Sequence, residues 1–162
     1  MAADPNRSQA SQLGLEADGD TRYDRVCQNA AAPQSFPEIA RFTGGAPCLI
    51  AGSTWPDDER LLKEMIGELP EVKLILAPHE INNAQLNHLK DFFPDAVFYS
   101  SLKNENQEGP LNEARILIID NVGMLSRVYH YATIAYIGGG FTKEGIHNTL
   151  EAAVYSKPVF FG

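Results

Sequence analysis

The sequence predicts an α/β fold in which a doubly wound parallel sheet carries helices on both faces. From position 46 onward, apolar runs alternate with segments whose apolar residues recur at helical spacing. The apolar runs are continuous, which is typical of parallel strands that are covered on both sides. The right-handed crossover rule then favours a doubly wound, Rossmann-like topology.

Six strands are expected, at 48–52, 72–77, 96–100, 115–120, 133–138 and 158–162. Helices are expected at 57–69, 81–93, 124–132 and 148–156, with further short helices possible at 21–30 and 36–42. Residues 101–110 are polar and contain glycine and proline, which predicts a loop.

We divide the chain into a polar N-terminal segment or linker, 1–45, and one ligand-binding domain, 46–162. The length of 162 residues is enough for a sizeable core. The last strand is not followed by a helix that could cover it. We therefore expect the chain to be part of a longer protein, truncated at its C-terminus.

Composition disfavours several functions. The net charge is −8 and no Lys/Arg cluster occurs, so nucleic acid and anionic lipid are disfavoured as direct partners. No apolar run reaches the roughly 18–20 residues that span a bilayer, so we expect a soluble chain. Cys27 and Cys48 lack neighbours at metal-ligand spacing, which predicts two reduced thiols and no metal site.

In an open parallel sheet, ligands bind at the carboxyl ends of the strands. After the first strand, Thr54 and Pro56 are typical of a helix start, with Thr54 as the N-cap. The hydroxyls of Ser53 and Thr54, with nearby amides, could equally hold an anion.

Pro78 and His79 follow the second strand. We expect Pro78 to end the sheet ladder and turn the backbone toward the cleft. A single histidine such as His79 is more often a surface or core residue than a ligand contact. After the fourth strand, 120–123 is ordinary turn sequence that would also leave amides facing the cleft.

Three glycines, 138–140, follow the fifth strand, and a helix is expected to begin near His147. Glycine permits close backbone approach, and the amides of a helix N-terminus attract anions. This combination predicts a phosphate cradle, although the spacing is neither G-x-G-x-x-G nor a Walker A loop.

Glu151 has two interpretations. With Asn148 it forms the N-x-x-E pattern of a capping box. Its carboxylate could instead accept both hydroxyls of a ribose, as acidic residues do in nucleotide sites. The spacing alone does not decide between them. No Ser-His-Asp order, paired-carboxylate pattern or His-Glu-x-x-His run is present.

Several segments, in order and at matching spacing, resemble the 3-deoxy-D-manno-octulosonic acid (Kdo) transferases; they are 19–26, 52–56, 138–141, 145–151 and 157–162. The resemblance implies the two-domain GT-B glycosyltransferase fold, of which this chain would be the C-terminal, CMP-sugar-binding half. It implies transfer of Kdo from CMP-Kdo to the lipid A precursor during lipopolysaccharide synthesis, with no metal or other cofactor.

The same resemblance implies action at the cytoplasmic face of the bacterial inner membrane. The N-terminal domain, expected to be absent here, would bind the lipid acceptor, associate with the membrane and carry the catalytic glutamate base. We therefore expect no catalytic residue in this chain, and an inactive protein when the chain is alone.

Particular positions acquire roles from the resemblance. Pro78 and His79 fall where the family has a Pro-Arg pair that contacts CMP, so the histidine is a departure. Gly123, Met124 and Leu125 fall on a Gly-Glu-Leu motif. Since Met124 replaces an acid, only its backbone contacts are expected to carry over.

Asn148 and Glu151 match the family's Asn-x-x-Glu, which holds the nucleotide ribose, and this favours the ribose role for Glu151. Further donor-binding residues are expected among Ser53, Thr54, Gly139, Gly140 and His147.

Two other functions fit the sequence. One is a different GT-B enzyme, such as a UDP-sugar transferase or a 2-epimerase. The other is a non-catalytic α/β binding module. Binding of CMP but not UDP would favour the Kdo transferase, and binding of neither would favour the module.

Overall fold

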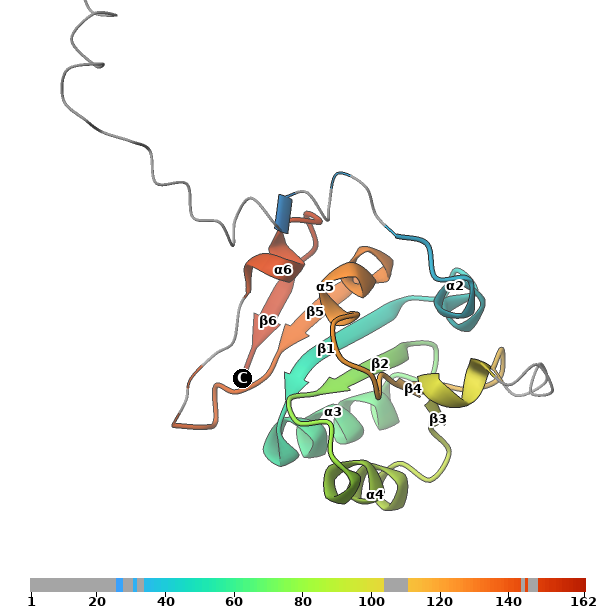
Figure 1. Cartoon of the computed structure of the whole chain (residues 1–162), viewed down its shortest axis with the longest axis vertical. Coiled ribbons are helices and arrows are strands. Elements are labelled where there is room, and N and C mark those ends of the chain that lie inside the picture. The colour runs from blue at the N-terminus through green and yellow to red at the C-terminus, as the bar shows by residue number, and fades with distance from the viewer. Residues whose placement is uncertain (1–25, 28–30, 32–33, 104–110, 144, 146–148) are drawn as a thin grey trace, which may run out of the picture.

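The computed structural model describes residues 26–27, 31, 34–103, 111–143, 145 and 149–162, and shows one twisted sheet with helices on both faces (Figure 1). The strands are β1 Cys48–Thr54, β2 Lys73–Pro78, β3 Val97–Phe98, β4 Ile116–Ile118, β5 Ile134–Ile137 and β6 Val159–Phe161. The helices are α2 Pro37–Thr43, α3 Pro56–Glu68, α4 Asn83–Phe92, α5 Leu125–Val128 and α6 Leu150–Ala153, with 3₁₀ turns η3 Tyr99–Lys103 and η4 Tyr129–Tyr131.

The described strands are parallel and lie in the order β3-β4-β2-β1-β5-β6. Leu49 of β1 pairs with Leu74 of β2 on one side and Ile134 of β5 on the other. The chain therefore winds in one direction from β1 to β2 and crosses back over β1 to reach β5. This confirms the predicted doubly wound sheet and puts its topological switch point between β1 and β5.

Each face of the sheet has its own core. On one face Leu62 and Ile66 of α3 and Leu89 of α4 pack against Leu74 and Leu76. On the other face α2, α5, η4 and α6 cover the sheet, and the residues that they bury include Ile39, Phe42, Val128, Tyr129 and Ala152. Helices on both faces explain why the strand sequences are apolar throughout.

Helix α3 spans Pro56–Glu68 and begins one residue before the expected range of 57–69, but its N-cap lies one residue after the expected one. Pro56 occupies the first turn as predicted, but the N-cap is Trp55, whose N–H donates to an Asp58 carboxylate oxygen at 2.9 Å. The prediction of Thr54 as N-cap was wrong because β1 continues through Thr54, which pairs with Pro78 of β2.

Three other elements are shorter than their sequence predicts. β3 ends at Phe98, because Asp120 accepts hydrogen bonds from the Ser100 N–H, at 2.8 Å, and from its hydroxyl, which favours the η3 turn. The expected helix 124–132 divides into α5 and η4, and the last helix is only Leu150–Ala153. The possible helix at 21–30 and the expected loop at 101–110 lie largely outside the described residues, and the described part of that loop, 101–103, belongs to η3.

Helix α2 belongs to the same packing unit as the sheet. Its Ile39 and Phe42 are fully buried in the core that β1 and β2 also form, and Gly44 caps it in the left-handed conformation at φ 54°. The predicted boundary at 45/46 therefore separates two segments that share one core.

Both cysteines are free thiols, as expected. Cys48 is buried in β1, and burial raises the pKa of its thiol to about 12, although the nearby Lys73 ammonium acts in the opposite direction. Among the described residues, no helix has the length and apolar character that crossing a membrane requires.

Candidate functional site

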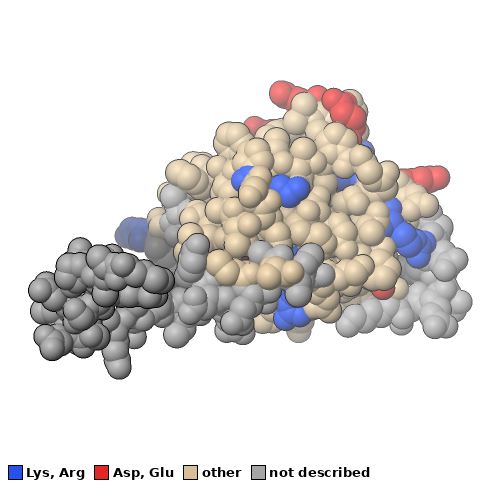
Figure 2. All heavy atoms as spheres, turned by 90° about the horizontal axis from the view of Figure 1, so that it is seen from above, with Lys and Arg blue, Asp and Glu red and all other residues tan. Residues whose placement is uncertain are grey.

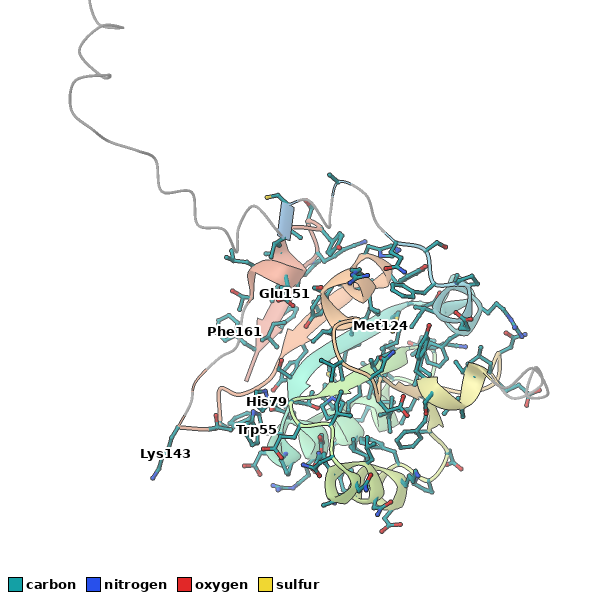
Figure 3. All side chains as sticks on the ribbon, in the orientation of Figure 1. Trp55, His79, Met124, Lys143, Glu151 and Phe161 are labelled. Atoms are coloured by element: carbon teal, nitrogen blue, oxygen red, sulfur yellow. The ribbon has the colours of Figure 1, made fainter. Side chains whose placement is uncertain are left out.

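An aromatic pair marks the carboxyl ends of β1 and β2. The Trp55 and His79 rings stack with their centroids 4.6 Å apart at 22° (Figure 3). Just before them, the register shifts between Gly52 and Thr54, and Ser53 has φ +53°, in the left-handed region. A non-glycine residue held there is strained, and such strain gathers at functional sites.

At this edge one expectation is confirmed and one is corrected. β2 ends at Pro78, as expected, and the last bond of the ladder runs from the His79 N–H to the Thr54 carbonyl oxygen at 3.0 Å. The Thr54 hydroxyl is buried and donates to Glu59 Oε1 at 3.3 Å. It is therefore committed to the protein and is not placed to hold an anion.

The glycines after β5 serve backbone packing. The Gly138 N–H donates to the Gly52 carbonyl oxygen at 2.9 Å, and the Gly139 N–H donates to Asp58 Oδ2 at 3.1 Å. A Cβ atom on Gly140 would lie 1.1 Å from the Gly162 carbonyl oxygen. The predicted cradle is thus wrong for the amides of Gly138 and Gly139, since both already have partners.

Helix α6 adds little attraction for an anion, because four residues align few peptide dipoles. This corrects the second half of the expected cradle. Its described N-cap is Thr149, while His147 and Asn148 lie outside the described residues, so the predicted capping box does too.

Glu151 lies in the first turn of α6, close to two tyrosine hydroxyls. Burial raises the pKa of Tyr129, and the Glu151 carboxylate raises it further. Burial also raises the pKa of Tyr155, which the Arg127 guanidinium lowers and the Glu151 carboxylate raises. The Arg127 and Glu151 charges therefore act in opposite directions on the pKa of the Tyr155 hydroxyl.

A pocket of about 270 Å³ lies beyond the carboxyl end of β4. It is lined by Gln34, Phe36, Tyr99, Asn121, Val122, Gly123, Met124 and Arg127. Gly123 is exposed with φ +84°, whereas the Met124 side chain is buried in the core. Leu125 packs against the same core.

Two residues that line the pocket, Asn121 and Arg127, each have a buried polar atom with no hydrogen-bond partner within the described residues. These atoms are Asn121 Oδ1, an acceptor, and Arg127 Nε, a donor, and both are inaccessible from the pocket. Arg127 is held by a second nitrogen, which donates to the Gln34 side-chain oxygen.

The predicted site residues fall into two groups. Met124 lies apart from the Trp55–His79 pair in Figure 3, so the edge of β1 and β2 is separate from the pocket. Sequence reasoning did not identify Asn121 and Arg127 as pocket residues. It also did not identify Asp58 as the buried acceptor for the Gly139 N–H. Each comes from a turn or helix start whose sequence is ordinary, so no local signal identifies them.

The surface and the polar side chains agree with the charge pattern of the sequence. Figure 2 shows basic side chains as separate spots on the visible face, without a continuous patch. Within the described part of the chain, no group of three or more His, Cys, Asp or Glu side chains gathers where a metal ion could be held.

A parallel sheet with a polar pocket beyond its strand ends is the arrangement of nucleotide-binding α/β domains. No family model matches the sequence. The chain is 34% identical over 125 residues to a 3-deoxy-D-manno-octulosonic acid transferase of Rickettsia prowazekii, a match that covers 70% of this chain and 25% of the relative. The chain is a relative of these transferases.

Two further relatives have a similar level of identity to this chain. Identity is 31% over 120 residues to the transferase of the same name from Aquifex aeolicus, covering 70% of this chain and 31% of the relative. The chain is also 31% identical over 121 residues to a bifunctional glycosyltransferase/methyltransferase of Fusobacterium nucleatum, a match that covers 74% of this chain and 18% of the relative. The chain thus spans less than a third of the length of these curated relatives.

The fold is shared with a solved structure, the C-terminal CMP-Kdo binding domain of WaaA from Acinetobacter baumannii. The TM-score is 0.61 at 16% identity, and the match covers 86% of this chain and 71% of that one. This likeness establishes the Rossmann-like fold that the sequence predicts.

Proposed function

We propose that this chain is the donor-binding domain of a Kdo glycosyltransferase and that it holds CMP-Kdo. The observation that carries the proposal is the pocket beyond β4, which is lined by Gly123, Met124 and the polar residues Asn121 and Arg127. The relatives' names and the shared fold support it.

The pocket is suited to the base of the donor. Its volume of about 270 Å³ is below the roughly 300–1,000 Å³ of sites that enclose a whole drug-sized ligand. Asn121 and Arg127 are the polar residues at the pocket that are proposed to recognise the base. The proposed preference for CMP over UDP rests on the CMP-Kdo binding domain whose fold the chain shares.

Glu151 is proposed to hold the ribose. Its carboxylate has two oxygens and can accept from both hydroxyls of the diol. Its charge acts on the hydroxyls of Tyr129 and Tyr155, and Tyr155 is also influenced by Arg127, which lines the pocket. The base and the ribose would then be held by neighbouring elements.

Transfer expels CMP, so negative charge develops on its phosphate. Fixed donors stabilise such charge without reorganising. With the amides of Gly138 and Gly139 occupied, the guanidinium of Arg127 at the pocket is proposed to take part in this task.

The rest of the reaction is proposed to come from the longer protein. The base, the lipid A precursor site and the association with the cytoplasmic face of the inner membrane would belong to other parts of it, and no metal would take part. The relatives are several times longer than the matched region, which leaves room for such a domain.

Calorimetric titration of the chain with CMP and with UDP tests the proposal. CMP should bind and UDP should bind at least about tenfold more weakly, a difference of roughly 1.4 kcal/mol. Equal binding would favour a UDP-sugar enzyme, and binding of neither would favour a non-catalytic module.

The Glu151→Ala variant tests the ribose contact. We expect CMP affinity to fall about tenfold while Tm stays within a few degrees, because Glu151 is only half-buried. Glu151→Gln should lose less CMP affinity than Glu151→Ala, since glutamine keeps one acceptor oxygen. If Tm collapses while CMP affinity holds, Glu151 is a helix cap.

A further inference from the structure

The Asp58 carboxylate joins three segments at the carboxyl ends of β1 and β5. Asp58 is fully buried. Its Oδ2 accepts from the Trp55 N–H at 2.9 Å and from the Gly139 N–H at 3.1 Å, and its Oδ1 accepts from the Tyr136 hydroxyl at 2.6 Å. A helix cap needs only the first of these contacts, so the other two require another explanation.

These contacts extend the junction between β1 and β5 beyond the sheet. The last ladder bond between the two strand ends runs from the Gly138 N–H to the Gly52 carbonyl oxygen. One residue further on, the Gly139 amide turns to Asp58, which lies 81 positions earlier in the chain. Asp58 therefore bridges the two strand ends at the topological switch point, where ligands of such sheets bind.

The bridge is closely packed. A Cβ atom on Gly138 would lie 2.6 Å from Asp58 Oδ2 and 2.5 Å from the Ser53 carbonyl oxygen. Ser53, held in the left-handed region, lies against the same contact. Strained residues persist only where their surroundings fix them, so the loop's position depends on the carboxylate.

We propose that Asp58 is a positioning residue of the donor site. It fixes the loop at 138–140 against Trp55, so that the loop and the Trp55–His79 pair face the donor in one arrangement. Being buried, Asp58 does not touch the ligand. The inference rests on the proposed function, because the ligand it positions for is CMP-Kdo.

Two variants of the whole 162-residue chain test this in different ways. Asp58→Ala removes the acceptor, and Gly138→Ala leaves the acceptor but pushes the loop off it. The readouts are CMP affinity by calorimetry and the hydrogen-exchange rate of the Gly139 amide by NMR. We expect each variant to lose at least about tenfold in CMP affinity, and the Gly139 amide to exchange faster in Asp58→Ala.

The conservative variant and the control are matched to the contacts. Asp58→Asn should restore CMP affinity to within about threefold of the original chain, because its amide oxygen can accept both N–H groups while its NH₂ donates to the Tyr136 hydroxyl. Asp57→Ala should change neither readout, since Asp57 is exposed and pairs only with Arg60, at 2.7 Å.

If Asp58→Ala does not fold, Gly138→Ala decides the question. Folded variants that bind CMP within about twofold of the original chain overturn the inference. If the original chain binds no CMP, the proposed function fails. The exchange rate of the Gly139 amide then still tests the bridge: an unchanged rate in Gly138→Ala overturns it, and a faster rate in Gly138→Ala supports it.

Discussion

Removing the hydroxyl of Tyr136 measures the strength of the bridge between β5 and α3. The side chain is 6% exposed, and its hydroxyl donates to Asp58 Oδ1 at 2.6 Å. Hydrogen bonds to charged groups contribute about 1.5–3 kcal/mol, and a buried carboxylate that loses a donor is costly. Tyr136→Phe should therefore lower the free energy of unfolding by about 2 kcal/mol, which is roughly 4–8 °C in Tm for a chain of this length.

The loss in free energy of unfolding caused by Tyr136→Phe should depend on pH. Burial, with the hydrogen bond to Asp58 and its charge, raises the pKa of Tyr136 above the ordinary tyrosine value. A raised pKa in the folded state means that the stabilisation is complete below the unfolded pKa of about 10 and declines at higher pH. The gap between the original chain and Tyr136→Phe should therefore narrow above pH of about 10.

Urea denaturation followed by the fluorescence of Trp55, the single tryptophan, gives the free energies. Tyr99→Phe is the matched control, because Tyr99 is similarly buried but its hydroxyl is 3.5 Å from Glu38 Oε2. Tyr99→Phe should lower the free energy of unfolding by less than about 1 kcal/mol. The reasoning is refuted if Tyr136→Phe costs no more than Tyr99→Phe.

Three further predictions follow from buried groups. Burial raises the pKa of Glu59, so the fold favours its protonated form and stability is lost as pH rises above the unfolded pKa of about 4.5. Glu59→Gln should therefore raise Tm at pH 7 and raise it much less at pH 4. An equal rise in Tm at the two pH values would contradict this. Since burial raises the pKa of the Cys48 thiol to about 12, a thiol reagent at pH 8 should modify Cys27 in the native chain and Cys48 only after denaturation, as mass spectrometry would show. Gly52→Ala would place a Cβ atom 2.0 Å from the Tyr129 hydroxyl, so urea denaturation should show a loss of about 1–3 kcal/mol; a neutral result would mean that Tyr129 moves freely.

The fold could be predicted because its strands are continuous apolar runs. Residues 48–52 and 133–138 are recognisable as buried strands without any tertiary information. The strand order could not be derived, since β4 inserts between β2 and β3 only through long-range packing. The cap at Trp55 was missed because it depends on how far β1 pairs with β2, and local propensity does not report that.

The site was harder to predict than the fold. Gly123 and Met124 were expected from the family resemblance, and the structure places both at the pocket. Asp58 looked like one of several acids at a helix start, and its contact with Gly139 joins residues far apart in the sequence. The amides of 138–140 were expected to face a phosphate, because sequence does not show that a buried carboxylate already occupies one of them.

An NMR titration of the isotope-labelled chain with CMP tests the donor-binding proposal most directly. The largest amide shifts should fall on Asn121, Gly123, Met124 and Glu151, around the pocket and its neighbouring helix. A second groove, lined by Asp95 and Arg115 among others, lies at the opposite ends of β3 and β4 and should be unaffected. Shifts centred on that groove, or no shifts at millimolar CMP, would contradict the proposed site.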